Sequence, residues 1–281
     1  MPTFKTSPLV SCELLRPQLG SSNLKIFDVR GGWGSDSETA KAAYRQGHVS
    51  GASFIDWRHD FVQDDTPINL ASVATRDQAK AAFSRLNISY SDTVVLYDDY
   101  HHMQAGRIWW AMKYWGFSNV KILNGGWKRW VELGLETTTD IPEISSGNFQ
   151  PELKSDYRVS LQSLVSNLND VNLIDARGPV GYAGDLSDPR TGHIPSAVNI
   201  PYSLMLDSET GLFKPEAELR RVFLESYSNI FDGDIVSSCG SGYAGTVLIL
   251  ALAQIGIHAP LFDGSFTVWK QDTQRVVEQT K

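Results

Sequence analysis

The chain carries one pattern of residues twice. Three short segments of its first half recur in the same order in its second half: residues 26–30 at 173–177, residues 47–52 at 192–197, and residues 124–127 at 263–266. The separation between matching residues falls from 147 (Asp28 to Asp175) to 139 (Gly125 to Gly264). Matches in constant order with a drifting separation indicate two copies of one domain that differ in the lengths of their loops.

Each copy alternates short apolar strands with helices. In the first copy we expect strands near residues 26–28, 53–56, 93–97 and 120–123, and helices near 76–86 and 105–115. In the second copy we expect strands near 173–175, 198–200, 235–238 and 260–262, and helices near 215–226 and 245–254. This alternation predicts an α/β fold in which each copy has a mostly parallel sheet flanked by helices. The predicted division is a domain at 1–136, a linker rich in Ser, Thr, Pro and Gly at 137–157, and a domain at 158–281.

Cys239 is the candidate nucleophile. It follows the strand-like run 235–238 and precedes the small residues Gly240, Ser241 and Gly242 and a predicted helix. Ligands bind beyond the carboxyl ends of parallel strands, and a helix N-terminus offers unpaired N–H groups and partial positive charge. Such a place favours the thiolate, which is the nucleophilic form of cysteine. We therefore predict that Cys239 is catalytic.

The first copy has Asp98 at the position of Cys239. Because a carboxylate is no thiol nucleophile, we expect the first copy to be catalytically inactive. Its turn also carries His101 and His102, which we expect at an exposed loop tip. Two histidines without an evident third ligand do not complete a metal site, and we predict none.

Composition limits the partners and the location. The net charge is −7 and no run of Lys or Arg forms a basic stripe, so we expect no nucleic-acid partner. No apolar stretch approaches the roughly 18 residues that cross a membrane, and the N-terminal residues lack the apolar core of a secretory signal. Two cysteines, Cys12 and Cys239, are too few for a disulfide scaffold. We expect a reduced, cytoplasmic protein, or a mitochondrial one if the source is eukaryotic.

Two other readings compete with a cysteine enzyme. Gly240, Gly242 and Gly245 spell the dinucleotide-binding pattern G-x-G-x-x-G, and Asp263 follows 18 residues after the last glycine. That pattern belongs after the first strand of its unit, whereas here it follows several elements of the second copy. The other alternative is a binding module that keeps the fold without catalysis, and the intact Cys239 argues against it.

Taken together, these motifs resemble the rhodanese superfamily, specifically its tandem-domain sulfurtransferases. The resemblance covers nearly the whole chain and rests on these segments: 105–110, 124–127, 175–177, 192–195, 239–242 and 263–265. It implies two tandem rhodanese-like domains that need no metal and no organic cofactor. The implied reaction moves a sulfane sulfur from thiosulfate or 3-mercaptopyruvate, through a persulfide on Cys239, to cyanide or a thiol, a protein thiol included.

The resemblance also implies a set of substrate-binding residues. The family's sulfur cradle corresponds to residues 239–244, so the predicted substrate-binding residues are Gly240, Ser241, Gly242, Tyr243, Ala244, Tyr182 and Arg190. Small neutral residues in the loop, with Ser241 polarising the donor, favour mercaptopyruvate. Arg190 matches one of two family arginines that hold the donor carboxylate, but Tyr182 stands where the other would be, as in thiosulfate-specific members. The donor therefore stays open between the two.

Other residues of these motifs have expected roles in the scaffold. We expect Tyr243 to place its ring at the rim of the pocket. Asp175, Arg177, His193 and Asp263 are expected to tie loops together rather than to react.

Overall fold

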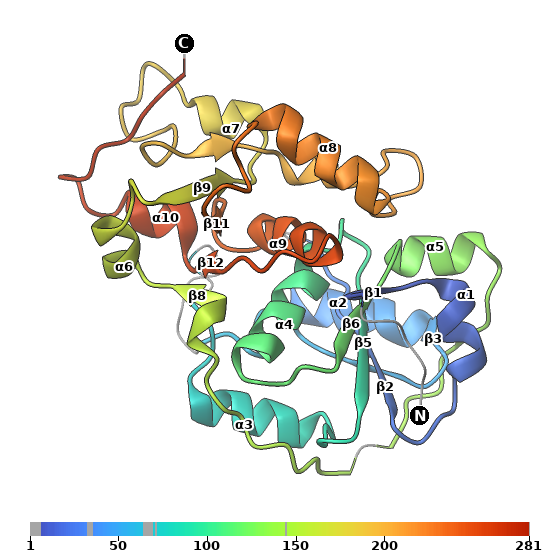
Figure 1. The fold of residues 1–281 in the computed structure, drawn as a ribbon. Helices are drawn as coiled ribbons and strands as arrows, with labels where there is room; N and C mark the ends of the chain where they lie inside the picture. The colour runs from blue at the N-terminus through green and yellow to red at the C-terminus, as the bar shows by residue number, and fades with distance from the viewer. Residues whose placement is uncertain (1–6, 33–35, 64–69, 71, 144, 281) are drawn as a thin grey trace. The chain divides into compact units, whose positions relative to one another are not determined.

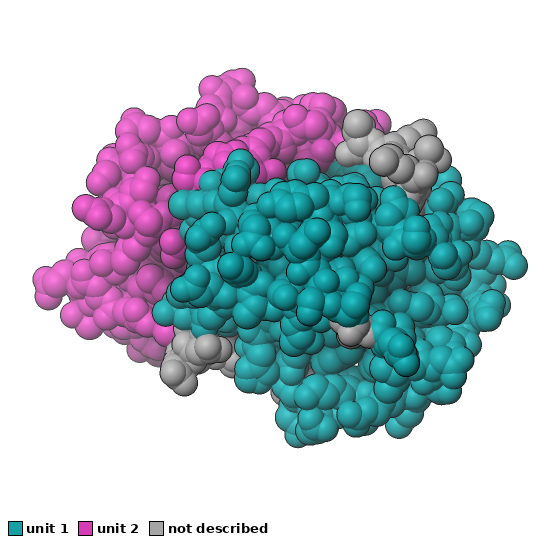
Figure 2. Space-filling model, turned by 90° about the horizontal axis from the view of Figure 1, so that it is seen from below, with its two compact units in different colours: residues 1–64, 73–154, 210–212 teal, residues 65–72, 155–209, 213–281 magenta. Residues whose placement is uncertain are grey.

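Figure 1 shows the fold in a computed structural model, which describes residues 7–32, 36–63, 70, 72–143 and 145–280. The chain forms two units, coloured separately in Figure 2. Unit 1 holds residues 1–64, 73–154 and 210–212, and unit 2 holds residues 65–72, 155–209 and 213–281. Each unit contains one five-stranded sheet in which all pairs of neighbouring strands are parallel.

All five strands in the sheet of unit 1 come from the first half of the chain. Its strand order is β4 (Ala52–Phe54), β2 (Leu24–Asp28), β5 (Thr93–Tyr97), β6 (Val120–Leu123) and β1 (Leu9–Val10). Its helices are α1 (Cys12–Leu15), η1 (Arg16–Gln18), α2 (Ser37–Gln46), α3 (Arg76–Arg85), α4 (Met103–Tyr114) and α5 (Gly126–Glu132). A short antiparallel pair, β3 (His48–Val49) with β7 (Thr137–Thr138), is added beside the sheet.

The sheet of unit 2 repeats this arrangement. Its strand order is β10 (Val198–Asn199), β9 (Val171–Asp175), β11 (Asp234–Ser238), β12 (Leu261–Phe262) and β8 (Arg158–Val159). Its helices are η2 (Ser155–Tyr157), α6 (Leu161–Ser166), α7 (Pro179–Ala183), η3 (Tyr202–Met205), α8 (Glu216–Ser226), α9 (Ala244–Gln254) and α10 (Ser265–Trp269). The matching strand orders confirm the α/β prediction of two similar domains with parallel sheets flanked by helices.

The central strands are β5 in unit 1 and β11 in unit 2. Every residue of β5 is buried, as is every residue of β11 after Asp234. Burial on both faces is typical of parallel strands covered by helices, and it explains why the buried residues of both strands include none that is charged. The predicted strands at 93–97 and 120–123 agree with β5 and β6, and the other predicted strand and helix ends lie within two residues of the observed ones.

Local signals explain where two of the helices begin and how they pack. The helix α3 begins after a capping box, in which the Thr75 side chain and Gln78 satisfy each other's backbone N–H groups. By contrast, α9 is apolar along nearly its whole length, with the sequence AGTVLILALAQ. A helix without a polar face has no side to present to water, and α9 is buried from Gly245 to Leu252.

Much of the predicted linker at 137–157 is packed against unit 1. Its first residues form β7, and its middle packs along unit 1. The Phe149 ring meets Phe83 and Phe117 edge-on, at centroid distances of 4.7 and 5.1 Å. Further along, the Glu152 N–H donates to the Trp115 carbonyl at 3.1 Å. The segment up to Lys154 is therefore part of the folded surface of unit 1.

Candidate active site

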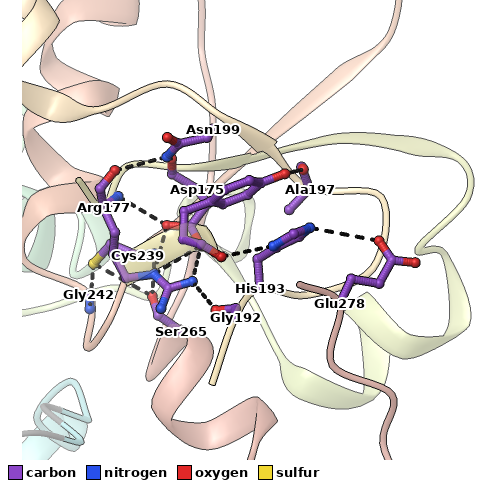
Figure 3. A network of polar contacts seen from close by, with 11 residues as sticks. Asp175, Arg177, Gly192, His193, Ala197, Asn199, Cys239, Gly242, Ser265 and Glu278 are labelled. Carbon is purple, nitrogen blue, oxygen red and sulfur yellow. Dashed lines mark hydrogen bonds and ion pairs between the residues drawn. The ribbon is translucent and has the colours of Figure 1, made fainter. Parts of the chain in front are cut away.

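Cys239 lies in the loop between β11 and α9, at the carboxyl end of the central strand of unit 2 (Figure 3). Its side chain is buried, with 2% of its surface exposed. The first turn of α10 holds the loop, because the Phe266 N–H donates to the Cys239 carbonyl and the Thr267 N–H to the Gly240 carbonyl, both at 3.0 Å. The sulfur thus lies where the topology of an open parallel sheet places ligands.

Two groups that can donate hydrogen bonds lie near the sulfur. The Gly242 N–H donates to Cys239 Sγ at 3.1 Å, and Ser265 Oγ lies 3.9 Å from the same sulfur (Figure 3). Gly242 has a φ of +90°, a conformation that glycine adopts without steric cost, and this turn directs its N–H inward. A backbone N–H fixed in such a turn is the kind of donor from which anion sites are built. The loop can therefore stabilise negative charge on Sγ.

The other loop residues differ in exposure. Gly240, Ser241 and Ala244 are partly exposed, whereas Tyr243 is 1% exposed. The expectation that Tyr243 places its ring at an open rim is therefore wrong, because the ring is turned into the protein. The third glycine of the alternative dinucleotide pattern also has a packing role. A side chain on Gly245 would approach Leu261 Cδ1 to 2.9 Å.

Asp175 and Arg177 support this loop from the neighbouring strand β9. Arg177 Nε donates to both carboxylate oxygens of Asp175 at 3.0 Å, and Arg177 Nη2 donates to the Gly192 carbonyl at 2.7 Å. The guanidinium lies 4.3 Å from the centroid of the Phe266 ring. Because Phe266 also holds the loop through its N–H, Arg177 supports the loop through this ring. The expected structural roles of Asp175 and Arg177 are confirmed.

His193 and Tyr182 form a second brace next to that pair. Their rings stack at 3.8 Å with an interplanar angle of 10°, and His193 Nδ1 is 2.9 Å from the Tyr182 carbonyl. The Tyr182 hydroxyl donates to the Ala197 carbonyl at 2.6 Å. Burial, followed by the charge of Asp175, raises the pKa of Tyr182 above its usual range, so the hydroxyl stays a donor. His193 therefore has the structural role expected of it.

A strap at the end of the described chain, residues 278–280, fastens the segment between Tyr182 and His193. His193 and Glu278 exchange backbone hydrogen bonds at 2.8 and 2.9 Å, and the Gln279 side-chain amide donates to the Thr191 carbonyl at 3.1 Å. A side chain on Gly192 would overlap the Glu278 carbonyl. The backbones therefore meet at a distance that only glycine permits at this position.

Arg190 lies in the fastened segment, and its guanidinium is held by backbone carbonyls. Nη1 donates to Arg275 at 2.9 Å, and Nη2 donates to Lys270 at 2.7 Å and to Asp272 at 3.1 Å. These three carbonyls follow α10, so the arginine closes the end of that helix. Its predicted contact with a donor carboxylate stays a prediction. Asp263 pairs with Arg158 across β12 and β8 at 3.1 Å, which confirms its structural role.

The first copy shows the same loop with a carboxylate in place of the thiol. Asp98 is 2% exposed and accepts N–H bonds from Tyr100 (3.1 Å), His102 (3.0 Å) and Ala105 (2.9 Å). The Trp127 N–H donates to its carbonyl, as Phe266 does at Cys239. His101 is exposed as expected, but His102 is 3% exposed, so its expected place at a loop tip is wrong. Burial lowers the pKa of His102.

Sequence reasoning missed two features of the site. Ser265 entered only as part of a motif, although its hydroxyl reaches the sulfur from 26 residues away in sequence. The signal was its replacement of Gly126, the matching residue of the first copy. The second is Tyr44, which repeats every contact of Tyr182: it stacks on His48 at 4.0 Å and donates to a backbone carbonyl at 2.8 Å. A longer loop in the second copy hid this match.

Neither a metal cluster nor a membrane span is found in the part of the chain that the structure describes. No three His, Cys, Asp or Glu side chains there are grouped to hold a metal ion. No helix there is long and apolar enough to cross a membrane.

The chain was compared with known proteins. A family model described as the rhodanese-like domain matches twice, at residues 11–133 and 160–272. SseB of Mycobacterium tuberculosis, named a putative thiosulfate sulfurtransferase, is 33% identical over 90% of each chain. The sulfur carrier protein TtuD of Thermus thermophilus is 33% identical over 93% of each chain. The crystal structure of SseA from Escherichia coli, which is described as showing the rhodanese fold of 3-mercaptopyruvate sulfotransferases, superimposes with a TM-score of 0.82 at 25% identity, over 92% of this chain and 98% of that one. The chain therefore belongs to the rhodanese family, with two rhodanese-like domains, and is a sulfurtransferase.

Proposed function

We propose that Cys239 is the residue on which this sulfurtransferase carries sulfur, as a persulfide. The observation that carries the proposal is the Gly242 N–H aimed at Sγ from 3.1 Å, in a loop at the carboxyl end of the central strand. Fixed donors of this kind stabilise charge that appears on the sulfur during transfer. The first copy, with Asp98 at this place, supplies scaffold and no nucleophile.

The proposed reaction has two half-reactions that pass through one covalent intermediate. The Cys239 thiolate attacks the sulfane sulfur of the donor and forms an S–S bond, while the bond from that sulfur to the rest of the donor breaks. With thiosulfate, the leaving group is sulfite, which takes the electron pair. An acceptor anion, cyanide or a thiolate, then attacks the outer sulfur. The S–S bond breaks, thiocyanate or a new persulfide leaves, and the Cys239 thiolate is restored.

Thiosulfate is the donor that we propose as preferred. An arginine binds a carboxylate best through two parallel N–H groups, and such a fork would suit mercaptopyruvate. Here both terminal nitrogens of Arg190 donate to backbone carbonyls. Tyr182 stands in the place of the other family arginine, and its contacts equal those of Tyr44 in the copy that has no thiol. Neither side chain therefore offers a pair of unengaged N–H donors to a carboxylate. Thiosulfate has no carboxylate and does not need such a pair.

Steady-state kinetics with cyanide as acceptor test both parts of the proposal. Thiosulfate and 3-mercaptopyruvate are compared as donors, and we expect the larger kcat/KM for thiosulfate. A larger value for mercaptopyruvate would overturn the donor assignment and mean that Arg190 leaves its carbonyls when the donor binds. Mass spectrometry after incubation with donor alone should show one added sulfur on the Cys239 peptide. Turnover without that adduct would overturn the persulfide mechanism.

The acceptor proposed for this chain is a thiol, and protein thiols are included. The similarity to a protein named as a sulfur carrier supports this wider class. Enzyme loaded with radiolabelled sulfane sulfur should pass the label to a reduced protein thiol as well as to a small thiol. Label that moves only to cyanide and small thiols would restrict the acceptor to small molecules.

A further inference from the structure

Ser265 adopts a backbone conformation that disfavours its own side chain. Its φ is +52°, in the left-handed region, where a residue with a Cβ is strained. Gly126 holds the matching position of the first copy at a φ of +56°. A side chain there would overlap the carbonyl of Asp98. The copy without the thiol therefore has the residue that fits this turn, and the copy with the thiol has a strained serine.

The Ser265 hydroxyl lies in the interior and connects three groups. Its residue is fully buried, at 0% exposure. Its oxygen accepts the Cys239 N–H at 3.1 Å, lies 3.0 Å from the Phe262 carbonyl and lies 3.9 Å from Cys239 Sγ (Figure 3). A hydroxyl has a single hydrogen, which rotates to suit its surroundings. That hydrogen can point to the Phe262 carbonyl or to the sulfur, but not to both.

We propose that Ser265 is a catalytic residue whose hydroxyl hydrogen turns from the Phe262 carbonyl to Cys239 Sγ when that sulfur becomes negatively charged. The proposal rests on Cys239 being the sulfur carrier. Hydrogen bonds to charged acceptors are stronger than those to neutral ones, so charge on the sulfur shifts the hydrogen toward it. Residues held in strained conformations cluster at active sites, where the strain positions a reacting group.

The two half-reactions place different demands on this hydrogen bond. When the acceptor attacks, Sγ is the leaving group and gains negative charge, so the hydroxyl accelerates this step. When the donor is attacked, Sγ loses charge, and a better-stabilised thiolate is a weaker nucleophile. The proposal therefore predicts that removing the hydroxyl slows the acceptor half-reaction much more than the donor half-reaction.

The test uses two variants that lack the hydroxyl and differ in strain. Ser265→Ala keeps a Cβ at the positive φ, and Ser265→Gly restores the residue of the first copy, which relieves the strain. Single-turnover experiments follow sulfite release after thiosulfate is added, and thiocyanate formation after the persulfide meets cyanide. In both variants we expect the second rate to fall roughly 10-fold and the first, at pH 9, to change by less than about 3-fold.

Alkylation of Cys239 by iodoacetamide gives a second measurement that needs no turnover. The rate is followed against pH by mass spectrometry, and its midpoint should rise by about one pH unit in both variants, the shift that corresponds to a 10-fold effect. A midpoint and a thiocyanate rate equal to wild type in both would overturn the proposal. Loss in Ser265→Ala with wild-type behaviour in Ser265→Gly would also overturn it, because backbone geometry alone would then explain the effect.

Failure of the proposed function would look different. Wild-type protein without donor-dependent thiocyanate formation, or a Cys239→Ser variant that retains it, would contradict Cys239 as carrier. The alkylation profile would still report whether Ser265 interacts with the sulfur. Thermal melting of both variants shows whether each is folded, and Ser265→Gly keeps the test valid if Ser265→Ala fails to fold.

Discussion

The loops at Asp98 and Cys239 are built on one plan but hold different groups. Both follow the central strand of a parallel sheet, and in both the carbonyl of this residue accepts an N–H from the start of a short helix, α5 for Asp98 and α10 for Cys239. At Asp98 a carboxylate accepts three backbone N–H groups. At Cys239 the N–H of Gly242 meets a sulfur. The first copy thus fills this place with a carboxylate, whereas the second has a thiol there.

The braces below the two loops are the same. Arg30 binds Asp28 and the Gly47 carbonyl and lies 4.0 Å above the Trp127 ring. Arg177 has the equivalent partners in unit 2. Conservation of the support across two copies, only one of which has a thiol, shows that the Asp-x-Arg pair serves the fold. The two loops differ in the group that they hold, a carboxylate in one copy and a thiol in the other.

The largest effect is expected from Cys239→Ser. It should lower turnover by more than about 1,000-fold, because a serine hydroxyl without an adjacent base is a poor nucleophile and cannot form a persulfide. Circular dichroism should show an unchanged fold, and Cys12→Ser should retain wild-type turnover as the matched control. Residual turnover in Cys239→Ser that is lost on Cys12→Ser would move the chemistry to the first copy.

The two arginine braces allow a paired test. Breaking a buried ion pair leaves an uncompensated charge and costs about 3–5 kcal/mol. We expect Arg30→Met to approach that range, since Arg30 and Asp28 side chains are 6% and 0% exposed, and Arg177→Met to cost less, since Arg177 is 16% exposed. Urea unfolding measures both. Only Arg177→Met should also slow turnover of the folded protein, and equal slowing by both variants would contradict the division between scaffold and site.

Gly242→Ala tests the backbone donor to the sulfur. The added Cβ disfavours a φ of +90° and turns the N–H away, so kcat/KM should fall about 100-fold, as when one donor of an anion site is lost. Gly256→Ala is the matched control, because Gly256 has a φ of +79° and open space around it at the end of α9. Both variants should lose about 1 kcal/mol of unfolding free energy. Equal turnover in the two would show that the Gly242 N–H is not needed.

Asp98→Asn should weaken the first copy by a smaller amount. The amide has one acceptor oxygen where the carboxylate has two, and it has no charge, so we expect a loss of about 1–2 kcal/mol in chemical unfolding. Turnover should stay at the wild-type level. A large fall in turnover with unchanged stability would mean that Asp98 takes part in the chemistry.

The smallest effect concerns Cys12. Burial, followed by the charge of Glu13, raises the pKa of its thiol to about 11. In the unfolded chain the thiol ionises near pH 9, so the free energy of unfolding should fall as the pH rises from about 9 to 11. The wild type should lose more stability over that interval than Cys12→Ala. At pH 8, iodoacetamide should label Cys239 before Cys12, and labelling in the reverse order would contradict this contrast.

The fold was predictable because its signals are local. The runs at 93–97 and 235–238 contain no charged residue, and the repeated Asp-x-Arg and Gly-His motifs set the order of the elements. The place of Cys239 in a loop at the end of a strand was predictable for the same reason, since its neighbours in sequence form that loop. Ser265 was not, because its contact with the sulfur depends on where α10 meets β11. The packing of Phe149 on unit 1 also depends on tertiary contacts that spacing does not reveal.

The strap at residues 278–280 has a practical consequence for handling the protein. Glu278 pairs with His193 as two strands of a sheet do, and the Thr280 N–H donates to the Ala183 carbonyl at 3.1 Å. Cleavage before Glu278 would remove these contacts from the segment that carries Arg190. Loss of activity after such cleavage would then report detachment of this segment rather than damage to the thiol.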